Sequence, residues 1–331
     1  MEYLNPLVTF IIINWNGGKF IQECVNSILN QTYKNIEIIV VDNASTDDSP
    51  FIIEKIQYNI PNLHLIKNHK NVGFAAACNI GIKRAKGEFI VCVNNDAVLS
   101  QEWLMEVMKE IMYSTGIAIA SGPIFYYTDP TLIWSFGAKF DCVSGFSWNL
   151  GQKKHIYGID EFDYLSGCVL IIRKSALQKI GMFDESFFLY DEDVDICFRA
   201  RYKGYRLAFI PKALAWHKIS EGKKKMPFKV YYYKTRSDLH FCLKHLDIHY
   251  IFSSLFFHGI SYIADIFFFR KNPLYLLLAI KAFFWNLINL HSIFKMRFLI
   301  KKDKLLWKPK NRFNEFINVT KDRLIRHETF W

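Results

Sequence analysis

The amino-acid sequence predicts an α/β protein in which a mostly parallel sheet is flanked by helices. Over the first two thirds of the chain, short apolar runs alternate with patterns of helical periodicity. This alternation is typical of parallel strands joined by right-handed crossovers. The chain has 331 residues, of which 51% are hydrophobic, so it can bury a sizeable core. The last third is rich in aromatic and basic residues instead, which predicts a separate helical region.

The individual elements follow in order from the hydrophobic pattern. Runs of β-branched and aromatic residues predict strands at 8–13, 36–41, 63–67 and 88–93. Apolar or small residues at helical spacing predict helices at 21–29, 51–57, 73–86 and 101–112. We then expect a strand at 168–172, a helix at 174–180, an acidic segment, and a final strand that ends near Trp216.

Seven cysteines are spread along the chain without any C-x-x-C spacing. Most of them lie in apolar segments, so we expect small core residues in a reducing compartment and not a disulfide framework. The first residues lack the basic stretch and the cleavage site of a signal peptide, and their apolar run is expected to be a buried strand.

A domain boundary is expected near residue 222, because the composition changes at the run Lys223–Lys225. Residues 1–222 then form the α/β domain, and residues 223–331 form a basic, aromatic and helical region. In that region the apolar stretches 251–269 and 274–290 contain ionisable residues, which are costly at the centre of a bilayer. Amphipathic helices that lie on the membrane are therefore favoured over two membrane spans.

The charge distribution indicates the kind of surface that this region meets. The formal net charge is +11, and Lys and Arg concentrate in the last third beside aromatic and aliphatic residues. That combination favours an anionic membrane surface over nucleic acid, and predicts a peripheral protein on the cytoplasmic face. A soluble helical cap or a dimer interface is the alternative.

Polar residues follow three of the predicted strands. In open sheets of this kind ligands bind beyond the carboxyl ends of the strands, so the loops after Ile13, Val41 and Val93 should converge. In the second loop Asp42 is a candidate acceptor for a pyrimidine N–H, and in the first Trp15 offers a face for stacking. Taken alone, the segment from Asp42 onward is equally typical of an Asx turn with a helix cap.

The third loop, Asn94-Asn95-Asp96, is a candidate metal site. A single hard carboxylate suits Mg²⁺ or Mn²⁺, which retain several water or phosphate oxygens. His217 ends an apolar run, and its neutral imidazole is a candidate second ligand. For each motif by itself, a polar turn or a packed histidine is the simpler interpretation.

A cluster of acids at Asp191, Glu192, Asp193 and Asp195 is the candidate catalytic group. Like charges at this density raise the pKa of some carboxylates, as a general base requires. The first turn of a helix also favours acids through its dipole, which is the structural alternative.

Taken together, these features resemble the family 2 glycosyltransferases of the GT-A fold, a Rossmann-like architecture, over roughly residues 6 to 220. The segment Ile11–Asn16, with Asn14 and Trp15, resembles the first strand and base-stacking loop of the family. The segment Val40–Asp47, with Asp42 and Ser45, resembles its V-D-x-x-S-x-D nucleoside loop.

A second stretch resembles the helix that cradles the donor in the rhamnosyltransferase-like branch of the family. It matches the pattern N-x-G-x-x-x-A-x-N and implies donor-binding roles for Asn71, Gly73, Phe74 and Asn79. The resemblance also implies donor contacts for Asn94 and Asn95, which stand where the family has the first residues of its D-x-D motif.

The resemblance assigns the remaining roles as well. Asp96 stands at the final aspartate of the D-x-D motif and is the implied metal ligand, and His217 matches a histidine that completes the metal site in some members. Glu192 and Asp193 match the E-D motif, whose aspartate acts as the general base. The D-x-x-x-R continuation at Asp195 implies structural support.

The implied function is an inverting transfer of a sugar, with rhamnose the weakly favoured choice, from a nucleotide-diphosphate sugar to an acceptor hydroxyl. The acceptor would be a glycan or a polyprenyl-linked molecule in cell-surface polysaccharide synthesis. The leaving pyrophosphate needs a divalent metal, Mg²⁺ or Mn²⁺, and the hydroxyl needs a carboxylate that takes its proton.

Two alternatives to this function remain open. A processive polysaccharide synthase shares the fold, but the chain has no Q-x-x-R-W motif. A catalytically inactive nucleotide-binding or membrane scaffold is consistent with the incomplete D-x-D motif. The chain has no G-x-G-x-x-G or G-x-x-x-x-G-K-[ST] sequence, which argues against a dinucleotide-dependent dehydrogenase and a P-loop kinase.

Overall fold

The structure is a computed structural model that describes residues 5–150, 162–218, 227–264, 267, 272–301 and 307–325. The chain folds into two compact units. The first comprises residues 1–138, 149–188 and 192–220, and the second comprises 139–148, 189–191 and 221–331. Two short segments from within residues 1–222 therefore pack with the C-terminal unit. The predicted boundary and the run Lys223–Lys225 lie outside the described residues.

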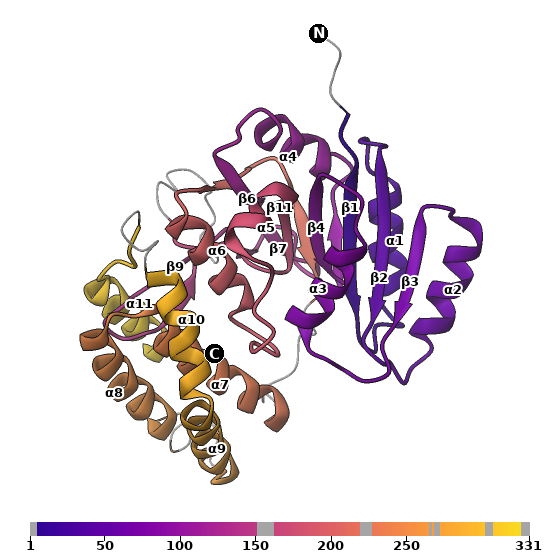
Figure 1. Cartoon of the computed structure of the whole chain (residues 1–331). Helices are drawn as coiled ribbons and strands as arrows, with labels where there is room; N and C mark the ends of the chain where they lie inside the picture. Colours follow the sequence, from indigo (N-terminus) through magenta and orange to yellow (C-terminus); the bar gives the residue numbers. More distant parts are fainter. Residues whose placement is uncertain are drawn as a thin grey trace. The chain divides into compact units, whose positions relative to one another are not determined.

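A seven-stranded sheet forms the centre of the first unit, with the order β12-β6-β11-β4-β1-β2-β3 (Figure 1). Its strands are β1 (Val8–Asn14), β2 (Ile36–Asp42), β3 (Leu63–Lys67), β4 (Phe89–Asn94), β6 (Ile117–Ser121), β11 (Val169–Arg173) and β12 (Arg206–Phe209). The pairs β1–β2, β1–β4, β2–β3 and β6–β12 are parallel, whereas β11 is antiparallel to both of its neighbours. The predicted α/β class with a mostly parallel sheet is confirmed.

Helices cover both faces of this sheet. They are α1 (Ile21–Leu29), α2 (Ser49–Asn59), α3 (Phe74–Arg84), α4 (Trp103–Ile111), α5 (Lys174–Ile180) and α6 (Glu192–Tyr202). Side chains of α1, α2 and α4 share one apolar core with alternate residues of β1, β2 and β4. The opposite face of β1 contacts α3, where a Cβ on Gly81 would lie 2.4 Å from Ile11 Cγ2. Only a glycine lets this helix approach the strand so closely.

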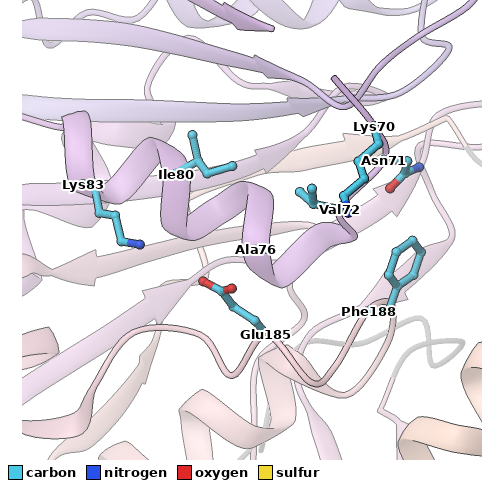
Figure 2. A pocket seen from close by; sticks show the side chains of 8 residues that line it. All are labelled: Lys70, Asn71, Val72, Ala76, Ile80, Lys83, Glu185 and Phe188. Atoms are coloured by element: carbon cyan, nitrogen blue, oxygen red, sulfur yellow. The ribbon is translucent and has the colours of Figure 1, made fainter. Parts of the chain in front are cut away.

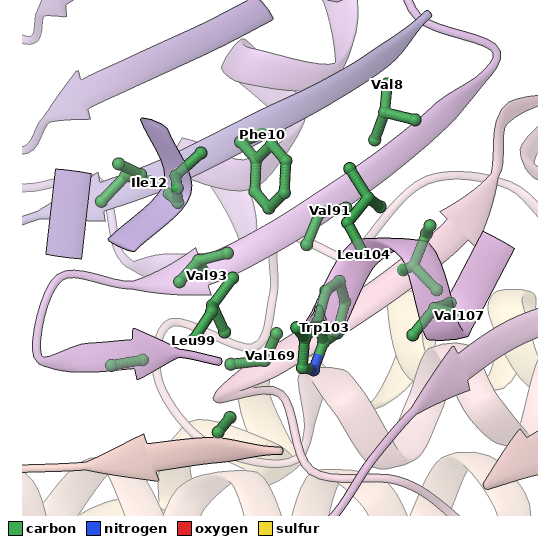
Figure 3. Packing of buried hydrophobic residues seen from close by; sticks show 14 of the residues in the cluster. Val8, Phe10, Ile12, Val91, Val93, Leu99, Trp103, Leu104, Val107 and Val169 are labelled. Carbon is green, nitrogen blue, oxygen red and sulfur yellow. The ribbon is translucent and has the colours of Figure 1, made fainter. Parts of the chain in front are cut away.

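The core on the α4 side is built from large apolar side chains. Figure 3 shows Phe10 of β1 and Val91 of β4 facing the same interior as Trp103 and Leu104 of α4. These side chains are almost fully removed from solvent. Because each strand residue alternates between faces, the continuous apolar runs in the sequence fill a core on both sides of the sheet. All seven cysteines are buried and unpaired.

A smaller sheet has four strands in the order β5-β13-β7-β8. All four strands come after β4 in the sequence. Its strands are β5 (Ala97–Leu99), β7 (Ile124–Tyr126), β8 (Ile133–Ser135) and β13 (Ala215–His217), and a separate pair is formed by β9 (Ala138–Phe140) and β10 (Ser147–Asn149). The final strand expected to end near Trp216 is present as β13, but the apolar run from Leu207 to Trp216 is not one strand. It is divided between β12 of the large sheet and β13 of the small sheet, since Pro211 has no N–H for a strand ladder.

The second unit is helical. It contains α7 (Phe228–His245), α8 (Ile248–Ala264), α9 (Leu274–Ile288), α10 (Leu290–Lys301) and α11 (Phe313–Ile325). Its small apolar cluster joins Tyr231 of α7 and Tyr262 of α8 to Tyr275 and Ala279 of α9. Among the described residues no single helix is long and apolar enough to cross a membrane. The bent pair Leu274–Ile288 and Leu290–Ile300, with a 64° angle, has sufficient length and apolar composition when taken together.

Candidate donor-binding and catalytic site

The loops after β1, β2 and β4 meet at the carboxyl edge of the large sheet. Asn14 is paired with Asp42 in the β1–β2 register, and its side-chain amide donates to Asp42 Oδ1 at 2.7 Å. The same amide group donates to Ser49 Oγ at 2.8 Å. Asn14 Oδ1 accepts a hydrogen bond of 2.9 Å from Asn95 Nδ2, after β4. One buried asparagine therefore connects all three loops, which confirms their predicted convergence.

Asp42 is almost fully buried, and its carboxylate is occupied by its own loop. Ser45 Oγ donates to Asp42 Oδ1 at 2.6 Å, and the Ser45 backbone N–H donates to Asp42 Oδ2 at 3.1 Å. These contacts close the polar turn from Asp42 to Ser45 through the aspartate side chain. Trp15, by contrast, is 50% exposed at the end of β1. The loop after β2 is therefore held by hydrogen bonds at Asp42, and the loop after β1 presents an aromatic side chain to solvent.

Two glycines follow Trp15, and the first of them is required by packing. A Cβ on Gly17 would lie 2.1 Å from Asn95 Nδ2 and 2.4 Å from Asn14 Oδ1. A larger residue would displace the Asn95 amide that joins the β4 loop to Asn14. The second loop is held to the first by Asn16, whose Oδ1 accepts the Thr46 N–H at 2.8 Å.

Asn43 is a buried polar residue that the sequence interpretation missed. Its Nδ2 donates to the Gly73 carbonyl at 3.1 Å, and its Oδ1 accepts from the Val72 N–H at 3.2 Å and from Asn68 Nδ2 at 3.0 Å. It thereby links the nucleoside loop to the turn before α3. The available signal was its place directly after a buried strand, where an amide side chain must find partners.

The segment Asn71–Phe74 forms a strained turn at the start of α3. Asn71 Oδ1 accepts the Gly73 N–H at 2.9 Å, and Gly73 adopts φ 90°, a conformation that favours glycine. A Cβ at Gly73 would lie 2.5 Å from the Phe188 carbonyl oxygen, which accepts the Phe74 N–H at 2.8 Å. The turn therefore holds the backbone at Phe188, which lies shortly before the acidic cluster in the sequence.

Asn79, which the resemblance implied as a donor-binding residue, is buried in α3 and is engaged by protein. Its Nδ2 donates to the Phe183 carbonyl at 2.8 Å and to Glu185 Oε1 at 2.9 Å. Its Oδ1 accepts the Phe183 N–H at 3.0 Å. These bonds fix the segment that follows α5 onto α3, so the structure gives this side chain a positioning role.

A pocket of about 490 Å³ lies along the outer side of α3. Figure 2 shows Lys83 on α3 and Lys70 in the preceding loop on its rim, with Glu185 and Phe188 opposite. Asn71 is the only predicted site residue among the eight that line it.

Asp96 and His217 are brought together by the small sheet. β13 pairs with β5 so that His217 lies opposite Ala97, and His217 Nε2 is 3.1 Å from Asp96 Oδ1. Burial lowers the pKa of His217, but the neighbouring Cys168 and Asp96 raise it, to about 10 overall. Within the part of the chain that the structure describes, no group of three or more His, Cys, Asp or Glu side chains could hold a metal ion.

Three acids of the cluster, Glu192, Asp193 and Asp195, lie in the first turn of α6, as the helix-dipole alternative predicted, and Asp191 precedes the helix. Asp193 Oδ2 accepts the Gly167 N–H at 2.7 Å, and a Cβ at Gly167 would lie 3.0 Å from Asp193 Cβ. The next residue, Cys168, accepts a 3.0 Å backbone bond from the Asn94 N–H. Asp193 therefore lies at the same sheet edge as the β4 loop. Glu192, the residue before Asp193, is buried.

Asp195 and Arg199 form a buried ion pair of 2.8 Å one turn apart in α6. The Arg199 guanidinium also donates to the carbonyls of Ile180, Gly181 and Met182. A buried charge with this many partners fixes the start of α6 against the end of α5. This arrangement is the structural support that the D-x-x-x-R pattern implied.

The fold, with its polar loops at the carboxyl edge of the sheet, is of the GT-A type. The mannosyltransferase PcManGT of Pyrobaculum calidifontis, solved with GDP-Man and Mn²⁺, has a TM-score of 0.56 and 17% identity, covering 92% of this chain and 88% of that chain. GalNAc-T7, solved with UDP, GalNAc and Mn²⁺, has a TM-score of 0.61 and 14% identity, covering 83% of this chain and 52% of that chain.

The sequence comparison identifies the family. The model of glycosyl transferase family 2 matches residues 9–181, and the chain belongs to that family. An uncharacterized glycosyltransferase of Rickettsia prowazekii, RP339, is 32% identical over 201 residues, which are 59% of this chain and 58% of that protein. The chain thus spans less than two thirds of this relative.

Proposed function

We propose that this protein transfers a sugar, with inversion, from a nucleoside-diphosphate sugar to a hydroxyl of a glycan or polyprenyl-linked acceptor. The observation that carries the proposal is the joined set of loops at one sheet edge. Asn14 connects the loops after β1, β2 and β4, and the Gly167 backbone holds Asp193 next to the residue bonded to Asn94. Membership of family 2 supports the same reaction type.

The residues present fit a divalent metal that is shared with the donor. Asp96 Oδ1 and His217 Nε2 converge to 3.1 Å, and His217 Nδ1 is a buried atom without a hydrogen-bond partner in the described part of the chain. Mg²⁺ and Mn²⁺ need only one or two protein ligands when phosphate oxygens supply the rest. Asp96 and His217 would hold the ion, and when bound it would neutralise charge on the leaving pyrophosphate. The two solved relatives named above are Mn²⁺ complexes.

Asp193 is proposed as the base that takes the proton of the acceptor hydroxyl. Its carboxylate is oriented by two backbone donors, Gly167 N–H at 2.7 Å and Val194 N–H at 2.9 Å. Fixed geometry of this kind is what general-base catalysis requires, because the carboxylate must meet the hydroxyl along one direction. Trp15 is proposed to stack on the nucleotide base, and the Asp42 loop is proposed to line the nucleotide site next to Trp15.

We further propose that the second unit binds the cytoplasmic membrane surface, where a lipid-linked acceptor would be available. Five large apolar residues, each three or four positions after the last, are exposed along α8: Ile248, Phe252, Phe256, Ile260 and Ile263. That spacing makes one apolar stripe on the helix. Residues 248–301 contain one acidic residue and six Lys or Arg, of which Lys281 and Lys295 are exposed. Anionic headgroups complement that charge.

The reaction is tested with a panel of nucleotide sugars that includes rhamnosyl, mannosyl and N-acetylglucosaminyl donors. Thermal stabilisation reports which donor binds, since a ligand that binds only the folded state raises apparent stability. Release of the nucleoside diphosphate in the presence of a glycan or polyprenyl acceptor then reports transfer. Binding without any transfer would support the inactive scaffold instead of the enzyme.

The membrane proposal is tested by sedimentation with anionic and neutral vesicles. The double variant Phe252→Ser/Phe256→Ser should lose binding to anionic vesicles, because both rings are exposed on the α8 stripe. Phe51→Ser on α2 is the matched control, since Phe51 is 69% exposed and Phe252 is 73% exposed. Equal sedimentation of the wild type, the double variant and Phe51→Ser would refute the role of α8. Binding of the wild-type protein to anionic vesicles should also weaken as the salt concentration rises.

A further inference from the structure

Two residues directly before α6 have an unusual backbone conformation. Tyr190 has φ 69° and Asp191 has φ 66°, so both lie in the left-handed region although neither is glycine. This conformation costs free energy for residues with a side chain, and it persists only where the surroundings enforce it. The next residue is Glu192, which begins α6, and Asp193 follows. The backbone at 190 and 191 therefore sets the direction in which the chain enters α6.

Contacts from one face of α7 hold this segment. Ser237 Oγ donates to the Leu189 carbonyl oxygen at 3.0 Å. Lys234 Nζ lies 3.7 Å from Asp191 Oδ1 and also pairs with Asp238. Lys234, Ser237 and Asp238 are spaced three and four residues apart, which puts them on the same side of the helix. We name Leu189, Asp191, Lys234, Ser237 and Asp238 the α7 clamp.

Lys234 is the residue on which the clamp depends. Asp191 and Asp238 are both buried, and Lys234 is the cation that pairs with each of them. Burial raises the pKa of Asp191 to about 7, with Lys234 lowering it and Asp238 raising it. Without the ammonium group, two buried carboxyl groups would face each other uncompensated, and the left-handed turn would lose its charged anchor.

We propose that Lys234 is a positioning residue for sugar transfer, which acts through Asp191 to orient the first turn of α6 and with it Asp193. The inference rests on the proposed function, in which Asp193 is the base. It assigns to the C-terminal region a part in catalysis that is separate from membrane binding. The α7 clamp holds the turn before Asp193 and contains none of the proposed donor-binding residues. Loss of the clamp should therefore lower kcat and leave donor affinity unchanged.

The test measures kcat, donor Kd and thermal midpoint for full-length variants with a water-soluble acceptor. Lys234→Met removes the charge and keeps most of the apolar stem. It should lower kcat by about tenfold to a hundredfold, the range for a small misplacement of a catalytic group. Donor Kd should remain at the wild-type value. Lys234→Arg should restore most of the lost rate, because a cation can again bridge the two carboxylates.

Two further variants keep the proposal falsifiable. Ser237→Ala removes only the bond to Leu189 and should cause a smaller loss of kcat, which gives a result even if Lys234→Met folds poorly. Lys229→Met, at an exposed position on the same helix, should match wild type. Wild-type kcat in both Lys234→Met and Ser237→Ala would overturn the proposal, as would a parallel loss of kcat and donor affinity. No turnover by the wild-type protein would instead refute the proposed function.

Discussion

The exchange Asp193→Asn should abolish most sugar transfer while leaving donor binding nearly unchanged. Asparagine has almost the shape of aspartate but cannot take the proton of the acceptor hydroxyl. A general base contributes about 10²- to 10⁴-fold to a rate, equivalent to about 3 to 5 kcal/mol of activation free energy. The expected kcat is therefore lower by that factor.

The structure also gives the cost to folding. Both carboxylate oxygens of Asp193 accept backbone N–H groups, from Gly167 at 2.7 Å and from Val194 at 2.9 Å. An asparagine has one acceptor oxygen, so one of these N–H groups would face an amide N–H₂. Both bonds are part-buried, so the cost of the unsatisfied donor is at the lower end of the range of about 1–3 kcal/mol for buried groups. That loss lowers the melting temperature by several degrees and leaves the protein folded.

The measurement is kcat for sugar transfer together with donor Kd by calorimetry, at saturating metal. Glu192→Gln is the internal control, and it should lose less activity if Asp193 alone faces the acceptor. Full activity of Asp193→Asn together with an inactive Glu192→Gln would move the base by one residue. Full activity of both variants would refute the mechanism and make the acidic turn purely structural.

Three further predictions concern the donor side of the site. Asp96→Ala should abolish Mg²⁺- or Mn²⁺-dependent donor binding in calorimetry, and His217→Ala should weaken this binding less. Unchanged metal dependence of donor binding in Asp96→Ala would refute the metal site. Gly17→Ala should lower donor affinity, because its Cβ would overlap Asn95 Nδ2 at 2.1 Å; an unaltered Kd would mean that the loops need not stay joined. Asn43→Ala should lower unfolding free energy by about 1–3 kcal/mol in urea titration, since it leaves buried partners unpaired, and unchanged stability would contradict its linking role.

Much of the first unit was predictable from local pattern. The apolar runs that became β1, β2, β3 and β4 are continuous and bounded by polar turns, and each lies within about a residue of its predicted range. Because parallel strands end at one edge, the sequence also predicted that Asn14, Asp42 and Asn95 would gather there. The roles of these residues toward a donor stay predictions.

Other features depended on contacts between residues distant in the sequence. The run from Leu207 to Trp216 has the apolarity of one strand, yet its two halves pair in different sheets because β6 and β5 offer separate partners. Asn79 matches a donor motif, but its amide is occupied by Phe183, a residue 104 positions away. Periodicity describes only what neighbouring residues prefer, so it could not reveal either result.

The sequence alone therefore determined the alternation of β1 to β4 with α1 to α3, the sheet edge that collects the polar loops, and the acids available for chemistry. The tertiary structure decided which of those groups meet. It paired Asp96 with His217 through β5 and β13, and it brought Lys234 of α7 to Asp191. The physical reason is that hydrophobic periodicity is a local property, whereas the position of a charged side chain is set by the partner that compensates its burial.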